Sequence, residues 1–180
     1  EGCMRKKNTK LTTILLVLLL LAGLSLLLYP SVSDYWNSFN QSRAIATYSE
    51  EVAQIDDKQY EELWKSAVRY NSNLPQTNER YVLTAEQRMI YESLLNLGKN
   101  GIMGYVEIPP IKVSLPIYHG TDEAVLQIAI GHLEWTSLPT GGESTHCVIS
   151  GHRGLPSAKL FSNLDQLKEG DVFYLRVLDE

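Results

Sequence analysis

Cysteine is scarce in this sequence: Cys3 and Cys147 are the only two among 180 residues. Two cysteines so far apart provide neither zinc-finger spacing nor a disulfide framework. The sequence also lacks a P-loop, a Gly-x-Gly-x-x-Gly fingerprint and a His-Glu-x-x-His metal motif. The four histidines have no helical metal-ligand spacing. We therefore expect neither a metal nor a cofactor.

Basic side chains are scarce beyond residue 10. The tail of residues 1–10 holds four of the 16 Lys and Arg residues, so the remainder carries 12 basic and 20 acidic side chains, a net charge of −8. A surface that acidic repels phosphate backbones. Nucleic acid is therefore not an expected partner.

A long apolar run without a charge extends from Leu11 to Tyr29. As a helix it would be about 28 Å long, close to the hydrocarbon thickness of a bilayer. The basic residues before it predict that the N-terminus is cytoplasmic and that the rest is extracellular. A cleaved signal peptide is the alternative, because residues 31–33 (Ser-Val-Ser) resemble a cleavage site. However, signal-peptide cores are usually shorter than this run.

Residues 34–100 have a helical pattern. Steps of three and four between apolar residues predict helices over 40–55 and 57–72, and a third helix beginning at Thr84. Asp56 with Gln59, and Thr84 with Gln87, fit capping boxes, and Gly98 is the expected end of the third helix. Residues 71–83 are predicted to form a loop.

Residues 101–180 are predicted to be rich in strands. The expected strands cover 104–108, 113–118, 146–150 and 171–177, with a short helix over 122–130 and helical turns over 160–167. Because the chain stops while a strand is finishing, and a sheet cut there would expose unpaired edges, we expect the natural protein to continue beyond Glu180.

The strongest local candidate for chemistry is His152. It follows an apolar strand and lies between Gly151 and the segment Arg153–Gly154, a setting that suits a residue presented to a cleft. The alternative is a turn histidine that makes one backbone hydrogen bond. Cys147 is a poor partner for it, because five strand residues span about 16 Å. We expect Cys147 to be a small core residue.

At this level of detail the sequence resembles the class C, pilus-building sortases. The resemblance is close over about residues 100–177. The motifs that carry it are residues 104–109 (Gly-Tyr-Val-Glu-Ile-Pro), 115–121 (Leu-Pro-Ile-Tyr-His-Gly-Thr), 131–134 (Gly-His-Leu-Glu), 136–139 (Thr-Ser-Leu-Pro), 145–155 (Thr-His-Cys-Val-Ile-Ser-Gly-His-Arg-Gly-Leu), 160–161, 164–165 and 170–171.

The resemblance implies a mainly β fold, an antiparallel sortase β-barrel that is incomplete here, preceded by a transmembrane helix and a helical region. It also implies a membrane-anchored cysteine transpeptidase of the Gram-positive cell envelope. Such enzymes cleave Leu-Pro-x-Thr-Gly sorting signals between Thr and Gly, and class C members join pilin subunits through lysine isopeptide bonds.

By the same resemblance, His152 is the catalytic histidine. The family's cysteine belongs to a Thr-Leu-x-Thr-Cys strand, which would come after residue 180, and its arginine comes later still. Arg153 does not match that arginine. We therefore expect the 180-residue chain alone to be inactive in transpeptidation and to fold poorly.

Two departures from the family pattern bear on the site. Cys147 stands where a small residue is common, which agrees with a core position. The sequence contains no Asp-Pro, although class C sortases often carry an Asp-Pro-aromatic lid, and residues 71–83 lie where that lid would be. We expect either no lid or a substitute such as Tyr81.

Two other interpretations remain open. The chain could be a truncated, inactive sortase remnant that acts at most as a binding protein. It could also be an unrelated exported hydrolase that uses Ser150 or Cys147.

Overall fold

The computed structural model describes residues 9–75 and 81–178. Most of the predicted cytoplasmic tail and the middle of the predicted loop lie outside these ranges. Four helices, α1 (Thr9–Val52), α2 (Asp57–Ser72), α3 (Ala85–Ser93) and α4 (Glu123–Leu126), accompany five strands. The strands are β1 (Ile102–Ile108), β2 (Val113–His119), β3 (Ile130–His132), β4 (Ile149–Ser150) and β5 (Tyr174–Arg176).

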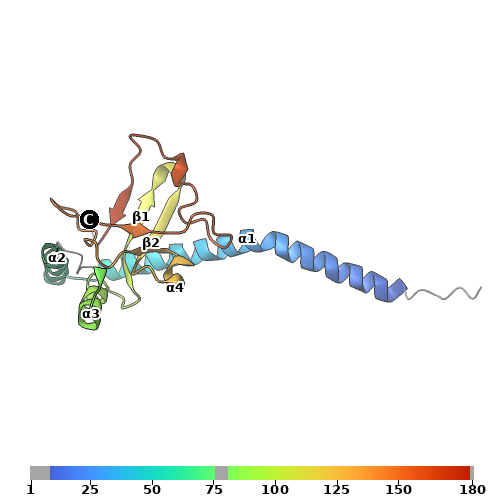
Figure 1. The fold of residues 1–180 in the computed structure, drawn as a ribbon, viewed down its shortest axis with the longest axis horizontal. Helices are drawn as coiled ribbons and strands as arrows, with labels where there is room; N and C mark the ends of the chain where they lie inside the picture. The colour runs from blue at the N-terminus through green and yellow to red at the C-terminus, as the bar shows by residue number, and fades with distance from the viewer. Residues whose placement is uncertain (1–8, 76–80, 179–180) are drawn as a thin grey trace, which may run out of the picture.

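The predicted anchor and the predicted helix over 40–55 form one continuous helix, α1 (Figure 1). The expectation of a separate helix beginning near residue 40 is therefore wrong. Pro30 lies inside α1, where it removes one backbone donor and its ring crowds the carbonyl four residues earlier; membrane helices tolerate such a proline. From Asn37 onward, residues at steps of three and four face the folded domain and end in the buried side chains of Tyr48 and Val52.

The capping predictions for α2 and α3 are confirmed. Asp56 Oδ1 accepts the N–H of Gln59 at 2.7 Å, and Thr84 Oγ1 accepts the N–H of Gln87 at 3.2 Å. In both boxes the glutamine side chain accepts the backbone N–H of the capping residue. These motifs form because each bond joins residues only three positions apart.

Gly98 does not end α3, which stops at Ser93. Leu94 is already extended, and Leu95 takes a left-handed φ of 56° that turns its side chain fully into the core. Burial of Leu95 outweighs continuation of the helix. The backbone at Gly98 instead passes close to the Glu51 carboxylate, the end of a flexible side chain that would have to shift to admit a Cβ.

The strands form one sheet in the order β4-β3-β2-β1-β5. Neighbours are antiparallel except β2 and β3, which run parallel because the connection through α4 crosses over. The expected antiparallel barrel therefore appears, in the described residues, as an open mixed sheet. Three predicted segments are shorter than expected: the strands over 146–150 and 171–177, and the helix over 122–130. The turns predicted over 160–167 include one short 3-10 helix, Leu164–Gln166.

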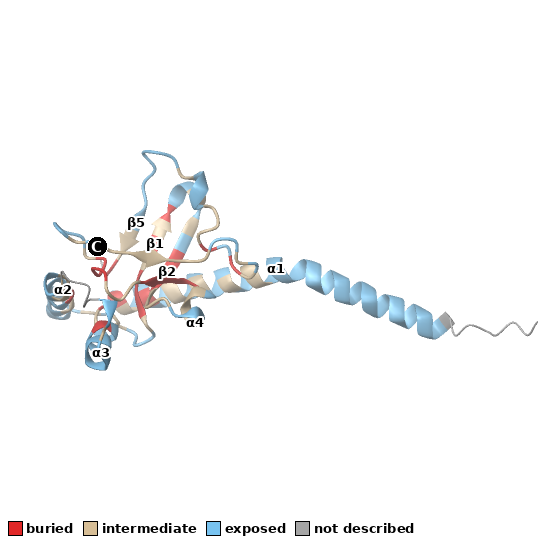
Figure 2. Cartoon of the chain, viewed as in Figure 1, coloured by how far each residue is buried: buried red, intermediate tan, exposed pale blue. Residues whose placement is uncertain are grey.

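The hydrophobic core joins the helices to the sheet (Figure 2). It combines Tyr48 and Val52 of α1, Ala67 of α2 and Tyr91 of α3 with inward side chains of β1, β2 and β3. The C-terminal half of α1 is therefore part of the folded domain, while its N-terminal half extends away from it (Figure 1).

Candidate active site around His152

His152 lies two residues beyond β4, at one edge of the sheet. Ser150 pairs with Gly131 of β3, and the backbone carbonyl of His152 accepts the N–H of Phe161 at 3.2 Å. The ring is half-buried, and its Nε2 atom is buried without a hydrogen-bond partner among the described residues. A buried polar atom without a partner is costly, so this ring nitrogen does not help to hold the described fold together.

The segment after His152 is tied down on two sides. Gly154, with a φ of 77°, donates its N–H to Ser162 Oγ at 3.0 Å. Asn37 of α1 donates to the Ser157 carbonyl at 2.8 Å. Arg153 forms an exposed ion pair with Asp165 at 3.1 Å, of a kind that contributes little to stability.

Cys147 is half-buried, not fully buried as expected. Burial raises the pKa of its thiol to about 11. At neutral pH it is therefore protonated, and a protonated thiol is a poor nucleophile. The structure gives no support to a Cys147–His152 dyad.

A second histidine, His132, lies fully buried beside α3 and was not singled out by the sequence pattern. Its Nε2 faces the Ser137 carbonyl at 2.8 Å, and its Nδ1 faces Tyr91 Oη at 2.9 Å. Because a carbonyl only accepts, the proton is on Nε2. The Tyr91 hydroxyl lies 2.9 Å from Nδ1 and 3.0 Å from the His132 carbonyl oxygen, so both acceptors share its proton, while its oxygen accepts the N–H of Gly120. Burial lowers the pKa of His132 to about 4, so this histidine is neutral and structural.

Comparison with known proteins shows what this architecture is. The family model described as the sortase domain matches residues 106–180. The solved structure of sortase C1 from Streptococcus agalactiae is 47% identical, with a TM-score of 0.73, and the match covers 77% of this chain and 72% of that one. The chain belongs to the sortase family.

Other relatives agree. Sortase C from Streptococcus pneumoniae is 42% identical with a TM-score of 0.63, over 76% of this chain and 69% of that chain. Sortase C-1 from Actinomyces oris is 43% identical with a TM-score of 0.60, over 66% and 68%. Sortase D from Bacillus subtilis (strain 168) is 36% identical over 72 residues, which are 40% of this chain and 33% of the relative. The chain therefore spans a third of that relative's length.

The helical region of this sortase contacts the segment after β3 near the predicted lid position. Tyr81 packs edge-on against Trp135, with ring centroids 6.0 Å apart. Arg88 of α3 forms an ion pair with Glu134 at 2.6 Å, and Tyr70 of α2 donates to the Glu134 carbonyl at 2.7 Å. Tyr81 thus lies against the segment that follows β3, and residues 76–80 of the predicted loop lie outside the described structure.

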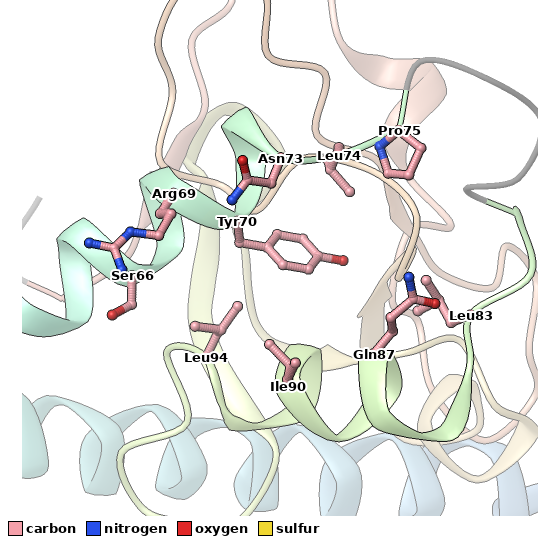
Figure 3. A pocket seen from close by; sticks show the side chains of 10 residues that line it. All are labelled: Ser66, Arg69, Tyr70, Asn73, Leu74, Pro75, Leu83, Gln87, Ile90 and Leu94. Carbon is pink, nitrogen blue, oxygen red and sulfur yellow. The ribbon is translucent and has the colours of Figure 1, made fainter.

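A hollow of about 430 Å³ opens between α2 and α3 (Figure 3). Tyr70, Leu74, Ile90 and Leu94 give it a largely apolar lining. It draws no residue from β4 or from the segment around His152, so it is separate from the candidate active site. Among the described residues, no group of three His, Cys, Asp or Glu side chains could hold a metal ion.

Gly151→Ala should damage this site through packing. A Cβ at residue 151 would lie 2.6 Å from Ile130 Cγ2 and 2.9 Å from the Phe161 ring. Overpacking of this kind costs about 1–3 kcal/mol of stability. We expect urea unfolding to show that loss. Gly23→Ala is the control, because its Cβ meets nothing within 4 Å, and equal stability of the two variants would contradict the packing argument.

Proposed function

We propose that this sortase is a membrane-anchored cysteine transpeptidase that cleaves Leu-Pro-x-Thr-Gly sorting signals after Thr and joins pilin subunits through lysine isopeptide bonds. The observation that carries the proposal is the buried, unpartnered Nε2 of His152 at the end of β4. A histidine whose Nε2 makes no hydrogen bond to a described residue suits general acid–base work.

The nucleophile comes from the Thr-Leu-x-Thr-Cys strand that the family resemblance predicts after residue 180. Among the described strands, β4 is paired on one side only, with β3. A strand pairing with the other side would lie about 4.8 Å away and could present a cysteine beside His152. The arginine follows in a later strand.

In the proposed reaction, the cysteine thiolate attacks the Thr carbonyl carbon and a thioester forms as the Thr–Gly amide bond breaks. His152 gives a proton to the leaving glycine amine. A pilin lysine amine then loses a proton to His152 and attacks the thioester. An isopeptide bond forms, the C–S bond breaks and the thiolate returns.

Pilin as substrate is supported by relatives. The structure of Streptococcus pneumoniae sortase C bears on pilin substrate specificity. The matched Streptococcus and Actinomyces structures are all sortase C enzymes. The proposed membrane anchor is the N-terminal part of α1. This helix lies near the N-terminus and is long and apolar enough to cross a membrane. We propose that the domain lies on the extracellular side.

Cys147→Ala should leave transpeptidation within about two-fold of the unsubstituted enzyme, because a protonated thiol does not serve as the nucleophile. The measurement is cleavage of a fluorogenic sorting-signal peptide by the protein encoded by the complete reading frame. Ser150→Ala is tested alongside. Loss of activity in either variant would favour the hydrolase interpretation instead.

The proposal itself is tested by trapping the intermediate. The complete protein is incubated with a Leu-Pro-x-Thr-Gly peptide without an acceptor amine and analysed by mass spectrometry. We expect an adduct of the peptide up to Thr on a cysteine beyond residue 180. An adduct on Cys147, or none with a folded protein, would overturn it; the latter result favours an inactive remnant.

A further inference from the structure

The part of α1 between the predicted anchor and the domain has two different faces. One face binds the domain: Asp34 Oδ1 accepts the N–H of Lys159 at 2.8 Å, Asn37 donates to the Ser157 carbonyl at 2.8 Å, and Gln41 donates to the Ile128 carbonyl at 2.6 Å. Asp34 also forms an ion pair with Lys159 Nζ at 3.3 Å. The first charge after the apolar run is therefore compensated.

The other face is aromatic and uncovered. It consists of Tyr29, Val32, Tyr35, Trp36 and Phe39, each between 54% and 74% exposed. At 100° per residue these five side chains fall within about a third of the helix circumference. They lie opposite the side chains that bind the domain. We call this set the aromatic face.

We propose that the aromatic face lies in the headgroup layer of the bilayer that holds the anchor. The helix α1 then leaves the membrane tilted, and the domain lies on the side of α1 that faces away from the lipid. The inference rests on the proposed membrane anchoring. The face continues directly from the uncharged run that begins at Leu11 and includes no charge of its own. Tyr and Trp are the residues enriched at this depth, because their rings are amphipathic.

The dimensions fit. The uncharged stretch runs to Ser33, about 34 Å of helix, which slightly exceeds a hydrocarbon core of about 30 Å. Tyr35 and Trp36 then reach the headgroup layer. Phe39 lies about 5 Å further along the helix and reaches the layer if α1 tilts by about 20°, as membrane helices commonly do.

The consequence concerns the active-site segment. Ser157 and Lys159, which follow His152 by a few residues, are bonded to Asn37 and Asp34 at the level of the aromatic face. Because α1 is continuous, the same helix fixes the membrane depth and the position of this segment. His152 would therefore be held at a fixed, short distance from the lipid surface. A sorting signal that is held near the membrane could reach it there.

The test places the complete protein, with Trp64, Trp135 and any tryptophan beyond residue 180 changed to Phe, in phosphatidylcholine vesicles whose acyl chains are brominated at shallow or deep positions. We expect Trp36 emission to fall at least two-fold with shallow bromines, and less with deep ones. The control keeps Trp64 alone, with Trp36→Phe and Trp135→Phe, and should stay unquenched, because α2 lies at the end of the domain remote from the free part of α1 (Figure 1).

A second measurement uses the unsubstituted chain. Hydroxyl-radical footprinting in vesicles should oxidise Tyr35 and Trp36 more slowly than Tyr174, although they are more exposed in the protein itself. A chain that does not float with vesicles would overturn both the anchor and this inference. A chain that floats but keeps Trp36 unquenched, whether open to water or covered by another protein, would overturn the inference alone.

Discussion

His152→Ala should reduce transpeptidation by about 10²- to 10⁴-fold, the usual contribution of a general acid–base group. The buried Nε2 atom has no partner among the described residues, so its removal breaks no internal hydrogen bond. We therefore expect the free energy of unfolding to change little. The measurement is kcat/KM for a sorting-signal peptide with the complete protein, beside urea unfolding of the same variant.

His146→Ala is the matched control for this prediction. His146 is exposed and lies in the same segment, where only its backbone N–H and carbonyl are bonded to Ser137. Its loss should leave kcat/KM unchanged. A His152→Ala enzyme that is folded and as active as the control would remove His152 from the mechanism.

Acid should destabilise this sortase through His132, by about 3 kcal/mol between pH 6.5 and about 4. Burial lowers the pKa of folded His132 to about 4 from 6.5. Within that window the unfolded chain binds a proton that the folded chain does not, so stability is complete above pH 6.5 and falls as the pH decreases. Burial also lowers the pKa of His119, which adds to the same trend.

Urea unfolding at a series of pH values measures this effect, with His132→Gln as the comparison. Glutamine can still donate to the Ser137 carbonyl and accept from Tyr91, but it does not titrate. The stability difference between the two proteins should shrink as the pH falls from 7 to 4. A constant difference would show that His132 does not titrate in this window.

Features that depend on residues close in sequence were predictable. The two capping boxes involve partners three positions apart, and both are as predicted. The helical stretch that carries the buried Tyr48 and Val52 was predicted from apolar residues at steps of three and four. The end of α3 was not predictable in this way, because the burial of Leu95 depends on the sheet beneath it.

The residues around the candidate site show the same difference between local patterns and long-range contacts. The proposal that His152 is catalytic came from its glycine-flanked strand end and from the resemblance, both of which are local patterns. The His132 network was not identified, because its partner Tyr91 is 41 residues away and only the fold brings them together. The strand β3, three residues long, was missed because it is too short for an alternating pattern.

The most direct test of the proposed transpeptidase is the bond it makes. The complete protein is mixed with a Leu-Pro-x-Thr-Gly peptide and a lysine-containing pilin, and the products are sequenced by mass spectrometry. We expect the Thr carboxyl of the cleaved signal joined to a lysine Nζ, with the glycine fragment released and the product absent for His152→Ala. Cleavage at another bond, or a joined product that persists without His152, would contradict it.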